Sequence, residues 1–385
     1  MTNSETPTWL SCLTPPGQAA LATLGLYGPR AWEALRGVFR PRSGGELPAV
    51  PIAGRFWLGR LGAEVTDEVV VAVKCVEPTP WLEIHGHGGR EVVRFLLDLL
   101  CEQGLQICNW KDFLRKTSDD ALSAVAAIAL AHAATVRTAG ILLDQQQGAL
   151  GRALDAILAA LDRADTATVE EGLTQLVRYA AVGQRLTQPW RVVVAGAPNV
   201  GKSSLVNALA GYQRSIVAAT PGTTRDVVTT RIALDGWLIE LADTAGLRTE
   251  AEELEEQGIR RAKATAAGAD LVLWVLDASA PAVWSNEKIG TMQYIINKID
   301  LPSVWEMEEK QNAVRVSAKT GEGLAELCAA LVRRLVPDPP PSGAAVPFTP
   351  HLAGRIVEAQ HVLSARDMAE TRRIVAALRQ NEVRS

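Results

Sequence analysis

The sequence predicts an α/β domain with a doubly wound, mostly parallel sheet, inserted in a discontinuous helical domain and preceded by an α+β domain. Apolar strands alternate with helices from Trp190 to Leu335, which is typical of doubly wound folds. Alanine-rich helical segments lie on both sides of that region, whereas the first part mixes strands with helices. The predicted boundaries are 1–116, 117–188, 189–336 and 337–385.

Composition restricts the classes of protein that the chain can belong to. Its 385 residues are enough for two or three domains, and 48% hydrophobic with 21% charged residues is ordinary for a globular protein. A formal net charge of −4 argues against indiscriminate nucleic-acid binding, although a local basic face for one structured RNA stays open. The 5 cysteines are scattered, which disfavours a zinc site and favours a reducing cytoplasm.

The start of the chain and its apolar runs bear on its location. The opening residues, MTNSETPTWLSCLTPPG, have neither a basic region nor a long apolar core, so we expect no signal peptide. No apolar run reaches the roughly 18 residues that a membrane helix needs. The expected location is therefore the cytoplasm, with no membrane partner.

Residues 1–116 contain both strand and helix signals. FWLGRLG (56–62) and EVVVAVKCV (68–76) are rich in β-branched or aromatic residues and predict strands. AWEALRGVF (31–39) and REVVRFLLDLLCEQG (90–104) predict helices, the second ending at its glycine. His85 and His87 are expected in a glycine-rich turn, where a structural role and a ligand contact are equally open.

The segment from 118 to about 185 is predicted to be a packed set of helices. Apolar residues recur there at helical spacing, and a new helix is expected to start in ADTATVEEGL (164–173) with an aspartate or threonine cap. The apolar positions are Leu122, Val125, Ile128, Leu150, Leu154, Ile157 and Leu161.

The last part of the chain returns to helix after a proline-rich stretch. VPDPPPSGAAVP (336–347) favours an extended, semi-rigid spacer. Beyond it, Ile356, Ala359 and Leu363 lie on one helical face. A tail of about forty residues is too short to form its own core, so we expect it to pack on the earlier helical segment.

A phosphate-binding loop is predicted where the α/β region begins. GAPNVGKS (196–203) fits G-x-x-x-x-G-K-[ST] and stands between a buried strand and a helix, which is the context that gives the motif its meaning. Backbone amides from Gly201 to Ser204 would cradle phosphates at the helix N-terminus. Lys202 would neutralise the β and γ oxygens, a catalytic role, and the Ser203 hydroxyl would bind Mg²⁺.

Two later loops point to guanine. NKID (297–300) follows the strand QYII, and its Asn297 and Asp300 can pair with the guanine edge beside Lys298. An isolated N-K-x-D is more often a capping turn, but here VSAKTGEGL follows, and the backbone around Ser317 and Ala318 can meet the guanine oxygen. Together with the phosphate loop they predict a GTP-binding domain.

Two segments between these loops are candidates for sensing the γ-phosphate. TPGTTRD (220–226) offers Thr223 and Thr224, of which Thr224 would complete the Mg²⁺ coordination. DTAG follows a strand, so that Asp243 would hold the same ion through water, with Gly246 beside it. The next residue, Leu247, replaces the glutamine that orients water in Ras-like proteins.

These motifs resemble those of the MnmE (TrmE) family of tRNA-modification GTPases. The resemblance rests on GAPNVGKSSLVNALAG, TPGTTRD, DTAGLR, NKID and SAK. LTPPGQAALATLGLYGPRAWE and LEIHGHGGREVVRFLLDLL are similar to the family's folate-binding domain. Era-like GTPases share the loops but lack the flanking domains.

The resemblance implies specific roles and partners. A glutamate of the second switch, which falls on Glu255, would orient the water in place of Leu247, and K⁺ held partly by Asn199 would stimulate hydrolysis. The family is a homodimer through its N-terminal domains, and it works with the flavoprotein MnmG on the wobble uridine of tRNA, using a tetrahydrofolate derivative. On composition alone, the segment around Glu255 would instead be a solvated acidic helix face formed by Glu252, Glu253, Glu255 and Glu256.

Departures from the family pattern leave a second function open. The family's C-terminal Cys-x-Gly-Lys motif has no counterpart after Cys328, and a family arginine falls on Gly25. PTPW (78–81) stands where the family has an acidic segment, and the helical domain is shorter than that of the family. The rival hypothesis is therefore a regulatory GTPase switch, or a ribosome- or RNA-associated GTPase, that binds a partner without modification chemistry.

Overall fold

A computed structural model describes residues 6–15, 17, 19–118, 120–212, 229–243, 268–285, 291–305 and 313–380. Internal contacts divide the chain into two compact units, residues 1–128 and 129–385. Within the described residues, no helix combines the length and apolar character needed to cross a bilayer.

The first unit is built on a seven-stranded sheet with one parallel pair, β1 with β7. Helices α1 (Ala31–Val38) and α2 (Arg90–Glu102) pack on this sheet, while α3 (Trp110–Thr117) packs on β1 and β2. The strands and helices predicted around 56–62, 68–76, 31–39 and 90–104 all form. The sheet order is β3 (Phe39–Pro41), β4 (Phe56–Gly62), β5 (Thr66–Cys75), β6 (Trp81–His87), β2 (Leu21–Tyr27), β1 (Trp9–Cys12) and β7 (Gln106–Ile107).

The prediction that His85 and His87 lie in a turn is wrong, because both belong to strand β6. His85 Nδ1 lies 3.0 Å from Thr23 Oγ1, and His87 Nδ1 lies 2.6 Å from Asp67 Oδ1. Gly86 between them serves close packing, since a Cβ there would lie 2.9 Å from Asp67 Oδ2. The glycine therefore marks a close approach of side chains within the sheet, not a change of chain direction.

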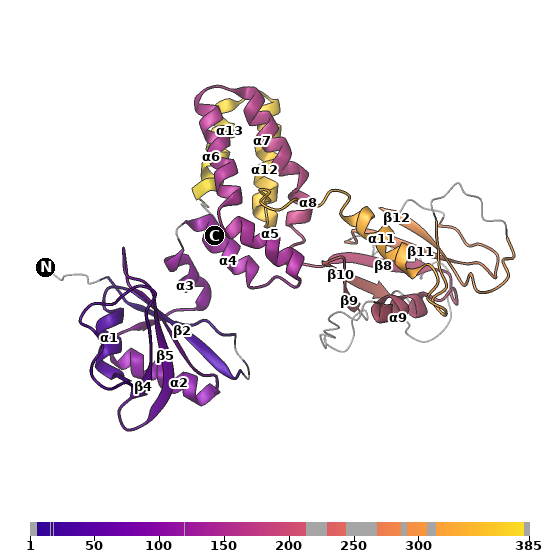
Figure 1. The fold of residues 1–385 in the computed structure, drawn as a ribbon. Helices are drawn as coiled ribbons and strands as arrows, with labels where there is room; N and C mark the ends of the chain where they lie inside the picture. Colours follow the sequence, from indigo (N-terminus) through magenta and orange to yellow (C-terminus); the bar gives the residue numbers. More distant parts are fainter. Residues whose placement is uncertain are drawn as a thin grey trace. The chain divides into compact units, whose positions relative to one another are not determined.

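Helices from two distant segments pack together in the second unit, and Figure 1 shows α12 and α13 (yellow) beside α6 and α7 (magenta). Asp165 caps α7 through its carboxylate, which accepts from Thr168 N at 3.2 Å, as the aspartate alternative predicted. The helices are α4 (Ala121–Leu130, which spans the boundary between the units), α5 (Val136–Gln146), α6 (Ala149–Asp162), α7 (Thr166–Arg178), α8 (Ala180–Gly183), α12 (Pro350–Ser364) and α13 (Met368–Gln380).

The proline-rich segment 336–347 contains no helix or strand, and helix α5 holds it through hydrogen bonds. Gln145 is 1% exposed, and its side chain donates to Ala344 O at 2.9 Å and accepts from Val346 N at 3.0 Å. Asp144 also accepts from Gly343 N at 2.7 Å. A buried glutamine amide can satisfy a backbone donor and a backbone acceptor together, so it replaces the sheet or helix bonds that this segment lacks.

A six-stranded sheet carries the motif region, and only its edge strand β9 runs antiparallel. Every residue of β11 is buried, as expected inside a parallel sheet. Helices α9 (Lys202–Tyr212) and α11 (Leu324–Leu335) pack against each other beside it. The sheet order is β13 (Val314–Arg315), β12 (Met292–Asn297), β11 (Leu271–Asp277), β8 (Trp190–Gly196), β10 (Trp237–Asp243) and β9 (Thr229–Leu234).

The β9–β10 hairpin meets the beginning of α5. Its turn is tight, with φ of 47° at Asp235 and 76° at Gly236. Thr135, the N-cap of α5, donates its hydroxyl to Gly236 O at 2.5 Å, and Arg137 pairs with Asp235 at 3.1 Å. The hairpin is thereby joined to the helical part of the same unit.

Candidate nucleotide-binding site

The phosphate loop, Asp243 and the NKID loop all lie at the carboxyl ends of strands in the six-stranded sheet. Strand register sets this arrangement, since Asp277 is the partner of Asn297 and Gly196 is the partner of Val275. Four strands of the sheet run parallel to one another: β8, β10, β11 and β12. Their carboxyl ends therefore lie at the same side of the sheet. Ligands of open α/β sheets bind outside these carboxyl ends.

The phosphate loop has the backbone that its sequence predicts. Gly201 has φ of 93°, and a Cβ there would lie 2.4 Å from Asn297 Nδ2. Asn199 is exposed with φ of 64°, a left-handed conformation that asparagine tolerates. Lys202 Nζ donates to Gly196 O at 3.0 Å and Ala197 O at 2.8 Å, so its ammonium group lies within the turn. Helix α9 begins at this lysine, with Ser203 and Ser204 in its first turn.

The structure brings the two described Mg²⁺ candidates together. Ser203 Oγ donates to Asp243 Oδ2 at 2.5 Å, and Asp243 is 8% exposed at the end of β10. Mg²⁺ prefers oxygen ligands and keeps several waters, so one hydroxyl with a nearby carboxylate and phosphate oxygens forms a suitable set. Among the described residues there is no cluster of three or more metal-binding side chains, which such a site does not require.

Asn297 joins three of the loops. It is 2% exposed, and its Nδ2 donates to Val200 O in the phosphate loop at 2.9 Å. Its Oδ1 accepts from Ala318 N at 3.0 Å. The side chain is therefore bonded within the protein, and it positions its neighbours as well as offering an amide edge to a ligand.

Asp300 and Ser317, both predicted to bind the base, lie in contact with each other. Ser317 is fully buried, and its hydroxyl donates to Asp300 Oδ1 at 2.7 Å. Ser317 Oγ also accepts from Thr320 N at 3.1 Å, which fixes the direction of the hydroxyl. Asp300 is exposed, so its oriented carboxylate can accept hydrogen bonds from a base that presents two N–H groups.

Several predicted site residues lie outside the described part of the chain. They are Thr223, Thr224, Gly246, Leu247 and Glu255.

Sequence reasoning missed the role of Asp277 at the end of β11. Its Oδ2 accepts from Lys298 Nζ at 2.6 Å, and its Oδ1 accepts from Ser279 N and Oγ at 2.8 and 2.7 Å. Burial raises the pKa of Asp277, but the hydrogen bonds from Lys298 and Ser279 outweigh burial and leave the pKa below its ordinary value. A charged residue ending an otherwise apolar strand was the signal available in the sequence.

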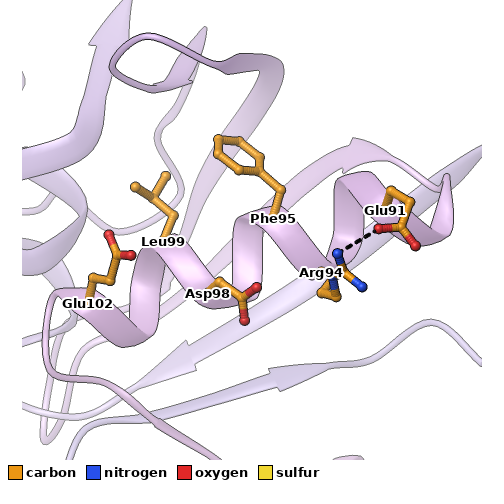
Figure 2. Close-up of a pocket in the computed structure, with 6 residues that line it drawn as sticks. All are labelled: Glu91, Arg94, Phe95, Asp98, Leu99 and Glu102. Carbon is orange, nitrogen blue, oxygen red and sulfur yellow. Dashed lines mark ion pairs between the residues drawn. The ribbon is translucent and has the colours of Figure 1, made fainter.

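A pocket of about 380 Å³ lies elsewhere, along helix α2 of the first unit (Figure 2). Its lining holds three carboxylates and one guanidinium, and Arg94 pairs with Glu91 at 3.0 Å. An excess of carboxylates repels a triphosphate, so this pocket is unsuited to the nucleotide. The lining residues are Glu91, Arg94, Phe95, Asp98, Leu99 and Glu102.

Comparison with known proteins identifies similar sequences over most of the chain. Residues 191–316 match the family described as 50S ribosome-binding GTPase. The tRNA modification GTPase MnmE of Thermotoga petrophila is 34% identical, over 85% of this chain and 82% of that protein. The tRNA modification GTPase MnmE of Geobacter sulfurreducens is 31% identical, over 92% of this chain and 86% of that protein.

Among solved structures, the G domain of the T. maritima FeoB iron transporter is 30% identical, covering 37% of this chain and 97% of that chain, with a TM-score of 0.30.

Replacing Asn297 by alanine should weaken guanine-nucleotide binding by about 30- to 100-fold. The substitution leaves the Val200 carbonyl and the Ala318 amide without their partner, a loss of about 2–3 kcal/mol for two buried bonds. Calorimetric titration with GDP measures the effect. The control is Gln293→Ala, a buried amide nearer the start of the same strand, which should leave the affinity within about twofold. Equal losses in both variants would contradict the assignment.

Proposed function

The chain belongs to the MnmE family of tRNA modification GTPases, and we propose that it hydrolyses GTP to GDP and phosphate as part of wobble-uridine modification in cytoplasmic tRNA. The observation that supports guanine-nucleotide binding is the joining of the phosphate loop to the guanine loops by Asn297, and hydrolysis is supported by the GTPase family match. The modification step is supported by the family, whose members named above are similar to this chain over more than four fifths of their length.

In this proposal each loop has its own task. Lys202 would neutralise the β and γ oxygens, while Ser203 and Asp243 would hold Mg²⁺ and Thr224, outside the described residues, would complete the coordination. When bound, the ion would supply positive charge that offsets the charge of the phosphate oxygens. Asp300 selects guanine, and Ser317 keeps its carboxylate in place.

The attacking water needs a polar group because Leu247 can neither donate nor accept a hydrogen bond. We assign that task to Glu255, in the acidic segment that follows DTAG. A carboxylate can accept a proton or a hydrogen bond from water, and it can orient that water in line with the γ-phosphate.

We further propose that K⁺ stimulates hydrolysis from a site beside Asn199. The side-chain amide carbonyl is a neutral oxygen ligand of the type that replaces water around K⁺. Asn199 is exposed on the phosphate loop, where a monovalent cation can reach it. Positive charge at this position, when bound, offsets the negative charge that develops in the transition state.

For the complete cycle we propose a homodimer that acts with an MnmG-like flavoprotein and tRNA. In this proposal the nucleotide-binding part, residues 189–336, is an insertion between helical segments 117–188 and 337–385, which contribute the mutually packed helices α6, α7, α12 and α13. Residues 1–116 would form the dimerisation domain.

The rival function, a GTPase switch without one-carbon chemistry, is favoured by one observation in the first unit. The family arginine of the folate-binding domain falls on Gly25, and a Cβ there would lie 2.5 Å from Phe113 Cζ. Phe113 is fully buried, so α3 excludes a longer side chain at position 25. The residues present do not fit the expected folate contact, and we derive no step through that cofactor.

Replacing Glu255 by alanine should slow GTP hydrolysis at least about 100-fold, because a positioned base typically contributes that much. The Kd for GTP should stay within about twofold, since the residue is assigned to water and not to the nucleotide. Single-turnover phosphate release measures the rate. Glu256→Ala is the matched control, and similar rates in the two variants would favour a solvated acidic face instead.

Exchanging K⁺ for Na⁺ at constant ionic strength should lower kcat by about tenfold or more, because the smaller ion fits the same oxygens poorly. In Asn199→Ala the two salts should give nearly the same rate. Equal turnover of the unaltered protein in both salts would remove the cation from the mechanism.

Deleting the gene should change the wobble uridines of the affected tRNAs. Mass spectrometry of nucleosides from total tRNA would then show loss of the modified form, restored by the intact gene but not by a variant carrying Lys202→Ala. Unaltered wobble uridines in the deletion strain would support the GTPase switch.

A further inference from the structure

Lys298 belongs to the guanine loop NKID and lies beside the phosphate loop. A Cβ built on Gly201 would lie 4.0 Å from Lys298 Cε, so the lysine stem passes beside the phosphate loop. Its backbone has φ of 66°, a left-handed conformation that is uncommon outside glycine. A nucleotide with phosphates at Gly201 and its base at Asp300 must pass this stem.

Asp277 holds the end of that lysine. Its Oδ2 is 2.6 Å from Lys298 Nζ, and the carboxylate is only 9% exposed while the lysine side chain is 31% exposed. The other oxygen, Oδ1, accepts two hydrogen bonds from Ser279, which fix the plane of the carboxylate. The backbone carbonyl of Asp277 also accepts from Trp305 Nε1 at 2.9 Å. The partner of Lys298 is thus a rigid acceptor at the end of a buried strand.

Lysine on its own is a poor surface for a ligand. Its side chain has four rotatable bonds, and ordering them costs up to about 2 kcal/mol of conformational entropy. A ligand that orders the stem on binding loses that much of its binding free energy. An ammonium already fixed by a buried carboxylate leaves the methylene stem ordered before binding. Pre-organisation of this kind raises affinity without any new contact.

We propose that Asp277 is a positioning residue for guanine-nucleotide binding, which acts by holding Lys298 so that the lysine stem forms one wall of the nucleotide site. The inference rests on the proposed function and adds a residue outside the loops predicted from sequence motifs. Because the wall would contact the base and sugar, its effect falls on GDP and GTP alike. Hydrolysis of bound GTP does not depend on it.

The test is Asp277→Asn, which retains an acceptor for Ser279 but removes the charge that holds the ammonium group. The Kd for both GDP and GTP should rise about tenfold, equivalent to about 1.4 kcal/mol, mainly through faster dissociation. The value of kcat at saturating GTP should stay within twofold. Stopped-flow displacement of a fluorescent GDP analogue gives the dissociation rate.

Asp270→Asn is the matched control, because Asp270 just precedes the same strand at its opposite end and pairs with Arg185 at 2.5 Å. It should leave the nucleotide Kd within twofold. Lys298→Met removes the ion pair with Asp277 by changing its more exposed member. This variant tests the role of Asp277 even if Asp277→Asn folds poorly. It should weaken binding by a similar factor, and the double variant should be no weaker than either single one.

Three outcomes would overturn the inference: an unchanged Kd in Asp277→Asn, an unchanged Kd in Lys298→Met, or losses that add in the double variant. An equal loss in Asp270→Asn would also overturn it, by assigning the effect to general stability of the sheet. The unaltered protein separates this inference from the proposed function. If that protein does not bind GDP or GTP, the proposed function fails; if it binds and the variants do not differ from it, only the role of Asp277 fails.

Discussion

One side-chain amide holds the candidate site together. Asn297 donates to the phosphate loop and accepts from the loop of Ala318, while its own loop carries Asp300. An aspartate could not donate and a leucine could do neither, so few side chains can meet both neighbours at this position. The arrangement depends on strand register, because parallel strands β11 and β12 end together and release their loops at the same edge.

The motifs made much of this site predictable from sequence. A phosphate loop must follow a strand and precede a helix, and β8 and α9 provide that context. The packing between loops was not predictable, since nothing in NKID indicates that Asn297 turns toward Val200 or that Lys298 finds Asp277. Those contacts join residues far apart in the sequence, and they depend on the order of the strands in the sheet.

Elsewhere one error has a local physical cause. Glycine at 86 suggested a turn around His85, but the glycine accommodates Asp67 across the sheet, and the alternation of apolar and polar residues in LEIH was the better signal. Proline at high density favoured an extended spacer near the end of the chain, but nothing in its sequence indicated that Gln145 of helix α5 would bond its backbone. The Gln145 side chain donates to Ala344 O and accepts from Val346 N, which ties the segment to that helix.

Strand β10 connects the phosphate loop to helix α5 through contacts at its two ends. Asp243 stands at one end, in contact with Ser203, and at the other end the Asp235–Gly236 turn is fastened to Thr135 and Arg137. Neighbours β8 and β9 bond it along both sides, so the strand is stiff against bending and stretching. The strand is therefore one continuous hydrogen-bonded connection between the carboxylate beside the phosphate loop and the first turn of helix α5.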